Sequence, residues 1–254
     1  QRQMCIRDRS STLKAGTYIL SRNMDIAQMV DIICTGNPAR KTVNVKIREG
    51  MEVEDIAELL VEEGILDSTE EFLSLCRSGE AFSEYSFVNS ILQSADKDQR
   101  KYALEGYLFP DTYEVYADAS AKSVITKMLI RFNEIFSDEY MDRAQELNMT
   151  VDQAVTMASM IEREAKTADF DKVSAVFHNR LNSGMKLQSD APLKYILDAG
   201  NTLDYTSDQM AVNSPYNTYN IDGLPIGPIC NPSAAAIKAA LYPDSDFMGE
   251  GYLY

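Results

Sequence analysis

Apolar residues at helical spacing constrain the fold of this chain more than any other feature of its sequence. Segment 151–165 shows the pattern clearly, because its apolar residues recur every third or fourth position with polar residues between them. That spacing places one apolar stripe along an amphipathic helix. The same pattern predicts helices over 24–36, 53–65, 68–76, 119–136, 138–147 and 170–184, with one more after residue 231.

Strands are predicted in only two short segments, 16–20 and 42–47, where apolar and polar residues alternate. Each segment precedes a predicted helix, and the two strand–helix units lie about 30 residues apart, which indicates a weak internal repeat. The sequence therefore predicts an α+β fold that is mixed but mainly helical, with short strands and long loops.

Polar residues that cap helices mark several helix starts. Thr150 with Gln153 has the pattern of a capping box, and so does Ser68 with Glu71. Asn231 is predicted to cap the last helix. The Asn-, Pro-, Gly- and Tyr-rich segment before Asn231 is then a long loop, and its composition favours a shaped polar surface over disorder.

The composition of successive segments predicts the division into domains. Residues 1–10 lack apolar periodicity and read as a translated cloning scar, whereas 11–76 carry the strand–helix units of a small module. Residues 77–100 are rich in Ser, Glu, Asp and Gln and are predicted to be a linker or boundary. Residues 101–254 form the second domain. No run of about 18 apolar residues occurs in the chain, so no transmembrane helix is predicted within it.

Charge and residue counts exclude several kinds of site. The net charge of −15 argues against nucleic acid as a partner, because phosphate binding needs a basic surface. His178 is the only histidine, and the four cysteines are far apart with no CxxC pair, so we expect isolated thiols, no metal and no cofactor. Helical spacing places His178 and Ser174 on the solvent side of their helix. Carboxylates are therefore expected to carry any proton transfer.

Two charged residues fall on apolar helix faces. Glu162 lies within the apolar arc of the helix at 151–165, and Arg180 projects into the apolar arc of the next helix. Because a buried charge needs a partner, the two are predicted to meet as a buried structural pair. Glu162 is alternatively a group that orients the catalytic cleft.

Four separated segments together resemble one protein family. They occur in family order and read LEGYLFPDTYEV, ASMIEREA, VFHNRLNSGMKLQSDAPLKYIL and SPYNTYNIDGLPIGPICNPSAAAIKAAL. They are similar to the YceG-like, endolytic murein transglycosylase family. LKAGTYILS and VKIREGMEVEDIAELL resemble the LysM-like N-terminal module of that family, and the likeness covers residues 12–254.

The resemblance implies where the protein works and what it contacts. Family members are bacterial membrane proteins with one N-terminal helix and an extracytoplasmic enzyme that cuts nascent peptidoglycan glycan strands. The expected partners are those strands and, by family analogy, peptidoglycan synthases. The chain lacks the membrane helix and the family's last segment, so we expect it to be cut at both ends, with residues 11–76 as the LysM-like module and 101–254 as the catalytic domain.

The resemblance also implies that Glu105 is the catalytic glutamate. A glycosidic bond needs an acid at its leaving oxygen, and in a lytic transglycosylase the same residue then acts as base. Such an acid must be protonated near neutral pH, which burial in an apolar pocket achieves. Tyr107, Phe109, Pro110 and Tyr113 are predicted to form this pocket, and Tyr107 also to contact the sugar.

Six further residues in the matched segments are candidates for sugar binding. For Asp190 the alternative is a turn cap. For the Tyr- and Asn-containing stretch it is a loop that holds itself together by hydrogen bonds. The candidates are Gln188, Asp190, Tyr216, Asn217, Thr218 and Tyr219.

Three functions remain open at this point. The first is a lytic transglycosylase that leaves 1,6-anhydroMurNAc ends. The second is a hydrolase (muramidase) in which Asp190 or Glu162 activates water. The third is a non-catalytic glycan-binding module built on the LysM-like half.

Overall fold

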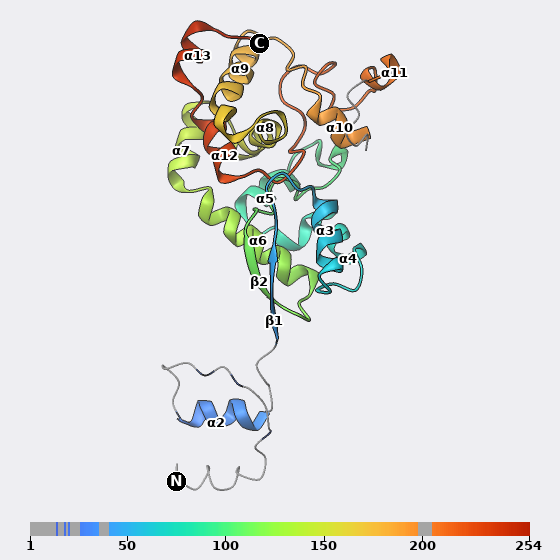
Figure 1. Ribbon diagram of the computed structural model, residues 1–254, viewed down its shortest axis with the longest axis vertical. Coiled ribbons are helices and arrows are strands. Elements are labelled where there is room, and N and C mark those ends of the chain that lie inside the picture. The colour runs from blue at the N-terminus through green and yellow to red at the C-terminus, as the bar shows by residue number, and fades with distance from the viewer. Residues whose placement is uncertain (1–13, 15–17, 19, 21–25, 36–40, 198–204) are drawn as a thin grey trace.

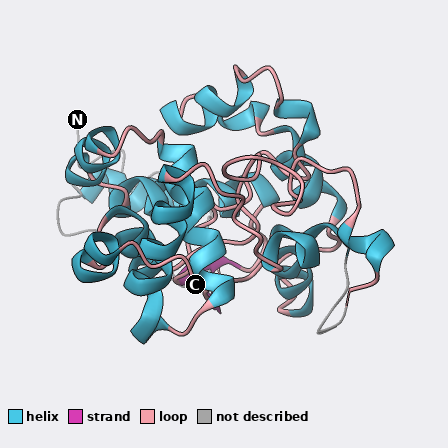
Figure 2. Ribbon diagram, turned by 90° about the horizontal axis from the view of Figure 1, so that it is seen from above, coloured by secondary structure: helices cyan, strands magenta, loops and turns pink. Residues whose placement is uncertain are grey.

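The computed structural model describes residues 14, 18, 20, 26–35, 41–197 and 205–254. Helices dominate the described residues (Figures 1 and 2), and the main ones follow the predicted periodicity within a few residues. In chain order the elements are α2 (Ile26–Thr35), β1 (Thr42–Lys46), α3 (Val53–Glu62), α4 (Glu70–Ser78), α5 (Ser86–Leu92), β2 (Thr112–Tyr116), α6 (Ala121–Ile135), α7 (Asp138–Glu146), α8 (Val151–Glu164), α9 (Phe170–Asn182), α10 (Ala191–Leu197), α11 (Ser207–Met210), α12 (Ala234–Leu241) and α13 (Ser245–Glu250).

The mainly helical α+β class is confirmed. The predicted strand at 16–20 and the scar at 1–10 lie outside the described residues, apart from Tyr18 and Leu20. Short 3-10 turns add three elements at Glu80–Phe82, Lys97–Gln99 and Thr167–Asp169. Among the residues that the structure describes, no helix is both long and apolar enough to cross a membrane.

A two-stranded antiparallel sheet joins distant parts of the chain. β1 pairs with β2 with Val45 opposite Tyr113, and alternation buries Val45, Tyr113 and Val115 on one face. β1 was predicted, whereas the residues of β2 were expected to belong to the turn that begins at Leu104. The turn ends earlier, because Thr112–Tyr116 finds a pairing partner that lies far away in the sequence.

One buried cluster spans both sides of the predicted boundary. It contains Ile56 and Leu60 of α3 together with Phe132 of α6 and Val155 of α8. Residues 77–100, expected to be a polar linker, contain α5, whose Phe87, Val88 and Ile91 are buried. The division into two domains stays a prediction, but the two sides share a core.

α8 lies at the centre of the upper half of the molecule in Figure 1. It packs against α5, α7, α9, α10 and α12. Thr150 caps it with the predicted box, in which the Thr150 hydroxyl accepts from Gln153 N at 3.1 Å. The polar residues Thr156 and Ser159, which lie between its apolar residues, are nevertheless buried, because helices pack around α8 on more than one side.

Two other expectations about helix starts are wrong. Thr69 is the N-cap of α4 and its side chain makes no capping hydrogen bond, so the Ser68–Glu71 box is not the start. Ser233, whose hydroxyl accepts from Ala236 N at 3.1 Å, caps α12 in place of Asn231.

Candidate active site

The turn that carries Glu105 is pressed against α8 and the long loop. Gly106 has a φ of +88°, a conformation that favours glycine. A Cβ at this position would also lie 2.5 Å from Pro228 and 2.9 Å from Val155 of α8. The turn can therefore approach this closely only with glycine after Glu105, which fixes the glutamate inside the molecule.

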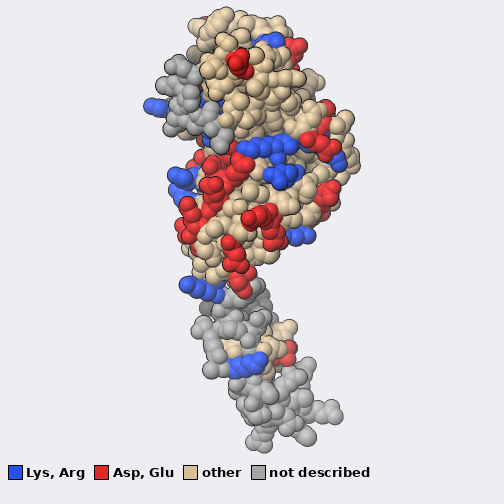
Figure 3. Space-filling view, turned by 90° about the vertical axis from the view of Figure 1, so that its right-hand side faces the viewer, with Lys and Arg blue, Asp and Glu red and all other residues tan. Residues whose placement is uncertain are grey.

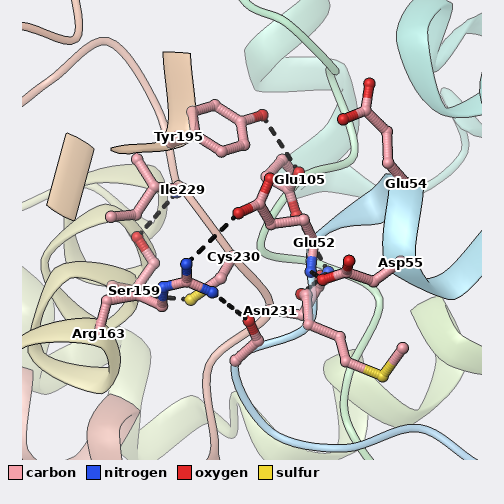
Figure 4. Close-up of polar contacts among 12 residues, drawn as sticks. Glu52, Glu54, Asp55, Glu105, Ser159, Arg163, Tyr195, Ile229, Cys230 and Asn231 are labelled. Carbon is pink, nitrogen blue, oxygen red and sulfur yellow. Dashed lines mark hydrogen bonds and ion pairs between the residues drawn. The ribbon is translucent and has the colours of Figure 1, made fainter. Parts of the chain in front are cut away.

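Three hydrogen-bond donors from three distant segments converge on the Glu105 carboxyl group (Figure 4). Oε2 accepts from Val53 N at 3.2 Å and from the Tyr195 hydroxyl at 3.1 Å, and Oε1 accepts from Asn231 Nδ2 at 3.1 Å. Glu105 is 1% exposed. Its partners come from the first residue of α3, from α10 and from the residues just before α12.

Burial raises the pKa of Glu105 to about 8. The Val53 N–H lowers this pKa, the nearby Glu52 raises it, and the Tyr195 hydroxyl and Lys101 lower it by smaller amounts. Loss of hydration is thus the dominant cause, because a carboxylate taken out of water is destabilised relative to its neutral form. At neutral pH Glu105 holds its proton, as expected of a general acid.

Tyr107, Phe109, Pro110 and Tyr113, the residues predicted to form an apolar pocket around Glu105, are all buried. The hydroxyl of Tyr107 donates to Asp152 at 2.8 Å, and that of Tyr113 donates to the Phe109 carbonyl at 2.5 Å. The groups that donate to Glu105 belong to other residues, which were not predicted as site residues. The pocket formed by the four residues stays a prediction.

Asn231 is the chief residue that sequence reasoning missed. It is fully buried, and besides its bond to Glu105 its Oδ1 accepts from Leu108 N at 2.8 Å. Its Nδ2 donates to the Met51 carbonyl at 3.0 Å, and the backbones of Met51 and Gly50 bond to that of Asn231 at 2.9 Å. Asn231 thus ties the turn before α3 to the turn of Glu105.

The turn at 50–53 brings a second acid to the site. Glu52 Oε1 lies 3.6 Å from Arg163 Nη2, and Arg163 Nη1 donates to the Gly50 carbonyl at 3.1 Å. Burial raises the pKa of Glu52 to about 7, against the opposing effect of Arg163.

An ion pair between Lys101 and Glu54 lies at the edge of the site. The two charged groups are 2.6 Å apart, and their side chains are 31% and 43% exposed. Lys101 Nζ also lies 4.8 Å from the centre of the Tyr195 ring. More acidic side chains cover the face that carries α3 and α4, with basic side chains gathered above them (Figure 3).

The predicted pair of Glu162 and Arg180 is not formed. Glu162 Oε2 accepts from the backbone N and hydroxyl of Ser233, at 2.9 and 2.6 Å, and so stabilises the start of α12. Arg180 donates to the carbonyls of Leu253 and Leu187, at 2.8 and 2.6 Å. Both side chains are only half-buried, so neither requires an opposite charge.

His178 is buried, and its predicted exposure is wrong. Its Nε2 lies 2.8 Å from the Ala240 carbonyl, and burial lowers its pKa. Ser174, also predicted to face solvent, is buried too. The physical reason is that α12 and α13 both pack against α9 and cover a face that helical spacing alone marks as polar.

Five of the six sugar-binding candidates hold the loop region together. Gln188 N donates to the Thr218 carbonyl at 3.1 Å, and the Thr218 hydroxyl donates to the Ser189 carbonyl at 2.9 Å. Asn217 Nδ2 donates to two loop carbonyls, and the Tyr219 hydroxyl donates to Asp190 at 2.7 Å. These contacts fit the alternative of a self-supporting loop, and a sugar-binding role for these residues stays a prediction.

Tyr216 is a sugar-binding candidate that packs against a partner of Glu105. It is 3% exposed, and its ring centre lies 5.3 Å from that of Tyr195, the partner of Glu105. It therefore supports the wall of the site. Three hollows open on the surface of the described part of the chain, and Glu105 lines none of these three.

Two of the four cysteines are buried free thiols, Cys76 and Cys230. Cys34 is half-buried, and Cys5 lies outside the described residues. Burial raises the pKa of Cys76 and of Cys230, and the charge of Glu105 adds to both shifts. The site therefore offers one neutral carboxylic acid amid uncharged hydrogen-bond donors, which is the arrangement of a general acid and base.

Comparison with known proteins gives one consistent family. The model of the YceG-like family matches residues 2–254. The endolytic murein transglycosylase of Bacillus subtilis (strain 168) is 30% identical over 250 residues, which are 96% of this chain and 67% of that protein. The endolytic murein transglycosylase of Streptococcus pneumoniae serotype 2 (strain D39 / NCTC 7466) is 31% identical over 253 residues, 90% of this chain and 44% of that protein.

A solved structure shows the same fold. The 2.6 Å crystal structure of a yceG-like protein from Listeria monocytogenes superposes with a TM-score of 0.70 at 32% identity. The match covers 99% of this chain and 82% of that one. The chain thus spans less than half of the pneumococcal relative but most of the solved chain.

Proposed function

The chain belongs to the YceG-like family, and from this premise we propose that it is a peptidoglycan lytic transglycosylase with Glu105 as its single catalytic acid and base. The observation that carries the proposal is the buried Glu105 carboxyl group, whose pKa is raised to about 8 and which no cation within hydrogen-bonding distance neutralises. The names of the relatives support peptidoglycan as the substrate.

In the proposed reaction one proton is given and one is taken back. Glu105 protonates O4 of the GlcNAc leaving group as the bond from O4 to C1 of MurNAc breaks. The resulting carboxylate then removes the proton from the C6 hydroxyl of MurNAc, whose oxygen bonds to C1 and closes the 1,6-anhydro ring. No water is consumed. The nucleophile is tethered to the substrate, so its effective concentration is high.

Tyr195 is suited to accommodate the proton on Glu105. Of the three groups bonded to the carboxyl group, the Val53 N–H and the Asn231 amide N–H only donate, whereas a tyrosine hydroxyl both donates and accepts. The acid proton is therefore best placed on Oε2, pointing at the Tyr195 oxygen 3.1 Å away.

Because Glu105 is 1% exposed, a sugar must displace a neighbour to reach it. The Lys101–Glu54 pair beside Tyr195 is the least costly group to move. Its two side chains are partly exposed, and such pairs contribute only about 0–1 kcal/mol. We place the approach of the glycan there.

The proposal includes the setting of the enzyme. Peptidoglycan lies outside the cytoplasm, so we place the protein on the extracytoplasmic side of the bacterial membrane, held by an N-terminal helix as in the family, with peptidoglycan synthases as partners. A hydrolase is less well supported, because neither Asp190 nor Glu162 is bonded to Glu105 or to its three partners.

The test is digestion of purified peptidoglycan followed by mass spectrometry of the products. We expect 1,6-anhydroMurNAc ends, and reducing MurNAc ends would overturn the proposal in favour of a hydrolase. Binding of the glycan without cleavage would favour a binding module. Glu105→Gln should lower the cleavage rate by about 10²–10⁴-fold, the usual contribution of a general acid–base group. Glu58→Gln, an exposed residue of α3, is the control, and full activity of Glu105→Gln would refute the assignment.

A further inference from the structure

A second acid lies beside Glu105, and the proposed reaction does not use it. Figure 4 shows the Glu52 carboxyl group between Glu105 and Arg163. Glu52 directly precedes Val53, whose N–H donates to Glu105 Oε2 at 3.2 Å. The backbone therefore fixes Glu52 next to the catalytic carboxyl group, whatever the side chains around it do.

Glu52 is an unusual residue for its position. It is the N-cap of α3, where Ser, Thr, Asp and Asn are preferred because their short side chains reach the free N–H groups of the first turn. Part of the capping comes from Asp55, whose Oδ2 accepts from Glu52 N at 2.9 Å. The Glu52 side chain belongs to the same capping box and also approaches Arg163, with Oε1 at 3.6 Å from Nη2.

Arg163 is anchored on the side of Glu52. It comes from the last turn of α8, and its Nη1 donates to the Gly50 carbonyl at 3.1 Å, two residues before Glu52. The Glu52 side chain is 19% exposed and that of Arg163 is 34% exposed, so the pair is partly shielded from water. Arg163 thus favours the ionised form of Glu52, and the described hydrogen bonds to Glu105 come from neither side chain of this pair.

We propose that Glu52 is a positioning residue that keeps Glu105 protonated, with Arg163 holding Glu52 in its ionised form. The inference rests on the proposed role of Glu105 as general acid. A negative charge beside a carboxyl group disfavours ionisation of that group, because two like charges repel in a poorly hydrated site. Glu52 acts through Glu105 and does not touch the sugar.

The pKa values are consistent with this division of roles. Burial is the main cause of both shifts, which raise the pKa of Glu52 to about 7 and that of Glu105 to about 8. The charge of Glu52 contributes to the shift of Glu105. Arg163 opposes the rise at Glu52, whereas the charge of Glu52 adds to the rise at Glu105, so Glu52 is the acid that ionises first.

The other charged and titratable groups around the two acids come from several elements. Around Glu105 they are Lys101, which precedes its turn, Tyr195 of α10, Tyr216 and Cys230 of the long loop and Cys76 of α4. Around Glu52 they are Arg163, Lys101, Asp55 and Glu54. Lys101 is paired with Glu54 at 2.6 Å, so its positive charge is largely compensated.

The experiment measures the Glu105 pKa directly, so it does not depend on cleavage. The carboxyl carbons of glutamate are labelled with ¹³C and titrated by NMR in the full chain, and the Glu105 resonance is identified by its loss in Glu105→Gln. Glu52→Gln should lower the Glu105 pKa by about one unit, the size of effect expected from a nearby charge. Glu58→Gln makes the same charge change on an exposed position of α3 and should leave the Glu105 pKa unchanged.

The pH profile of cleavage gives a second readout. In Glu52→Gln the alkaline limb should move to lower pH by the same amount, with about tenfold less protonated Glu105 at pH values above its pKa. Arg163→Gln should raise the Glu52 pKa, and Arg163→Lys should restore it.

The outcomes separate this inference from the proposed function. An unchanged Glu105 pKa in Glu52→Gln overturns the inference even if the enzyme cleaves peptidoglycan. Loss of cleavage at every pH with an unchanged Glu105 pKa also overturns it, since Glu52 would then act on the substrate. If the wild type cleaves nothing but the pKa shifts as expected, the inference stands and the proposed function fails.

Discussion

Two acidic residues in the core region of this molecule differ in the charge of their hydrogen-bond partners. Asp152, in the first turn of α8, faces the guanidinium of Arg100, with Oδ1 at 2.9 Å from Nη1, and also accepts from the Tyr107 hydroxyl. The Arg100 side chain is 6% exposed. The described hydrogen-bond donors to Glu105, by contrast, are all uncharged.

The difference teaches what makes an acid suitable for proton transfer. A bidentate arginine compensates the charge of a carboxylate and fixes its orientation, which serves packing. The long loop before α12 packs directly on Arg100 at Gly227, where a Cβ would lie 2.9 Å from Nη1. This close contact holds the Arg100 side chain in its position beside Asp152. Glu105 lacks such a cation, and burial therefore leaves it protonated and able to release a proton when its surroundings change.

The largest loss of stability is expected from a substitution that breaks the Asp152–Arg100 ion pair. Asp152→Asn leaves the Arg100 guanidinium buried without its charged partner, and loss of one member of such a pair typically costs about 3–5 kcal/mol. Urea denaturation at neutral pH measures this loss of unfolding free energy. The alkaline limb of the cleavage profile should stay where it is in the wild type, and a shifted limb would show that the two sites are coupled.

The raised pKa of Glu105 should make the stability of the protein depend on pH. The pKa of Glu105 rises from 4.5 to about 8 on folding, so the native state binds more protons than the unfolded state between these values. The free energy of unfolding should therefore fall as pH rises from about 5 to about 8, by on the order of a few kcal/mol. Glu52, with its own raised pKa, adds to the fall.

Denaturation at a series of pH values tests this slope. Glu105→Gln should flatten it, leaving the part due to Glu52. The same slope in the variant and the wild type would mean that Glu105 ionises normally.

Two buried asparagines allow a matched comparison. Asn231→Ala leaves the Leu108 N–H and one Glu105 oxygen without partners, which should cost about 1–3 kcal/mol. Asn217→Ala removes an equally buried amide that binds the Met210 and Val212 carbonyls, and should cost a similar amount.

Only Asn231→Ala should also raise the Glu105 pKa, because it removes a donor to the carboxylate. Thermal unfolding and NMR titration of both variants measure the two quantities. Equal pKa values in the two variants would contradict the assigned role of Asn231.

The smallest effect concerns Tyr107. Tyr107→Phe removes the hydroxyl that donates to Asp152 at 2.8 Å but keeps the ring, which stacks on Phe87 with centres 5.2 Å apart. We expect a loss of about 1 kcal/mol of stability, the net value of one hydrogen bond. The KM for glycan should be unchanged; a raised KM would support the sugar contact predicted from the sequence.

Local pattern was sufficient to predict most helices. The spacing of apolar residues placed α3, α6, α8 and α9 within a few residues, and the Thr150 capping box is formed as expected. It could not tell which polar face is covered by a distant helix, so His178 and Ser174 were assigned to solvent. β2 was missed because its pairing partner, β1, lies far away in the sequence.

Sequence reasoning proposed one acid for the candidate site, Glu105, and its catalytic role stays a prediction. The resemblance selected Glu105, and burial of that residue supports the choice. Its partners Val53, Tyr195 and Asn231 carry no local signal, since a backbone N–H has no side-chain signature and Asn231 resembled a helix cap. The Asn-, Pro- and Gly-rich composition before Asn231 predicted an ordered loop there. It did not predict which residues of the loop face Glu105.

The bonds that hold Glu105 have a consequence for synthesis of the protein. They join residues 52, 90 and 126 positions apart in the sequence. Such non-local contacts form late in folding. Asn231 emerges last from the ribosome, and until it is in place Glu105 is an ordinary surface glutamate with an ordinary acidity. The raised pKa of Glu105 is thus acquired only when the chain closes on itself, so an unfinished copy of the protein carries this glutamate without the acidity that the proposed reaction needs.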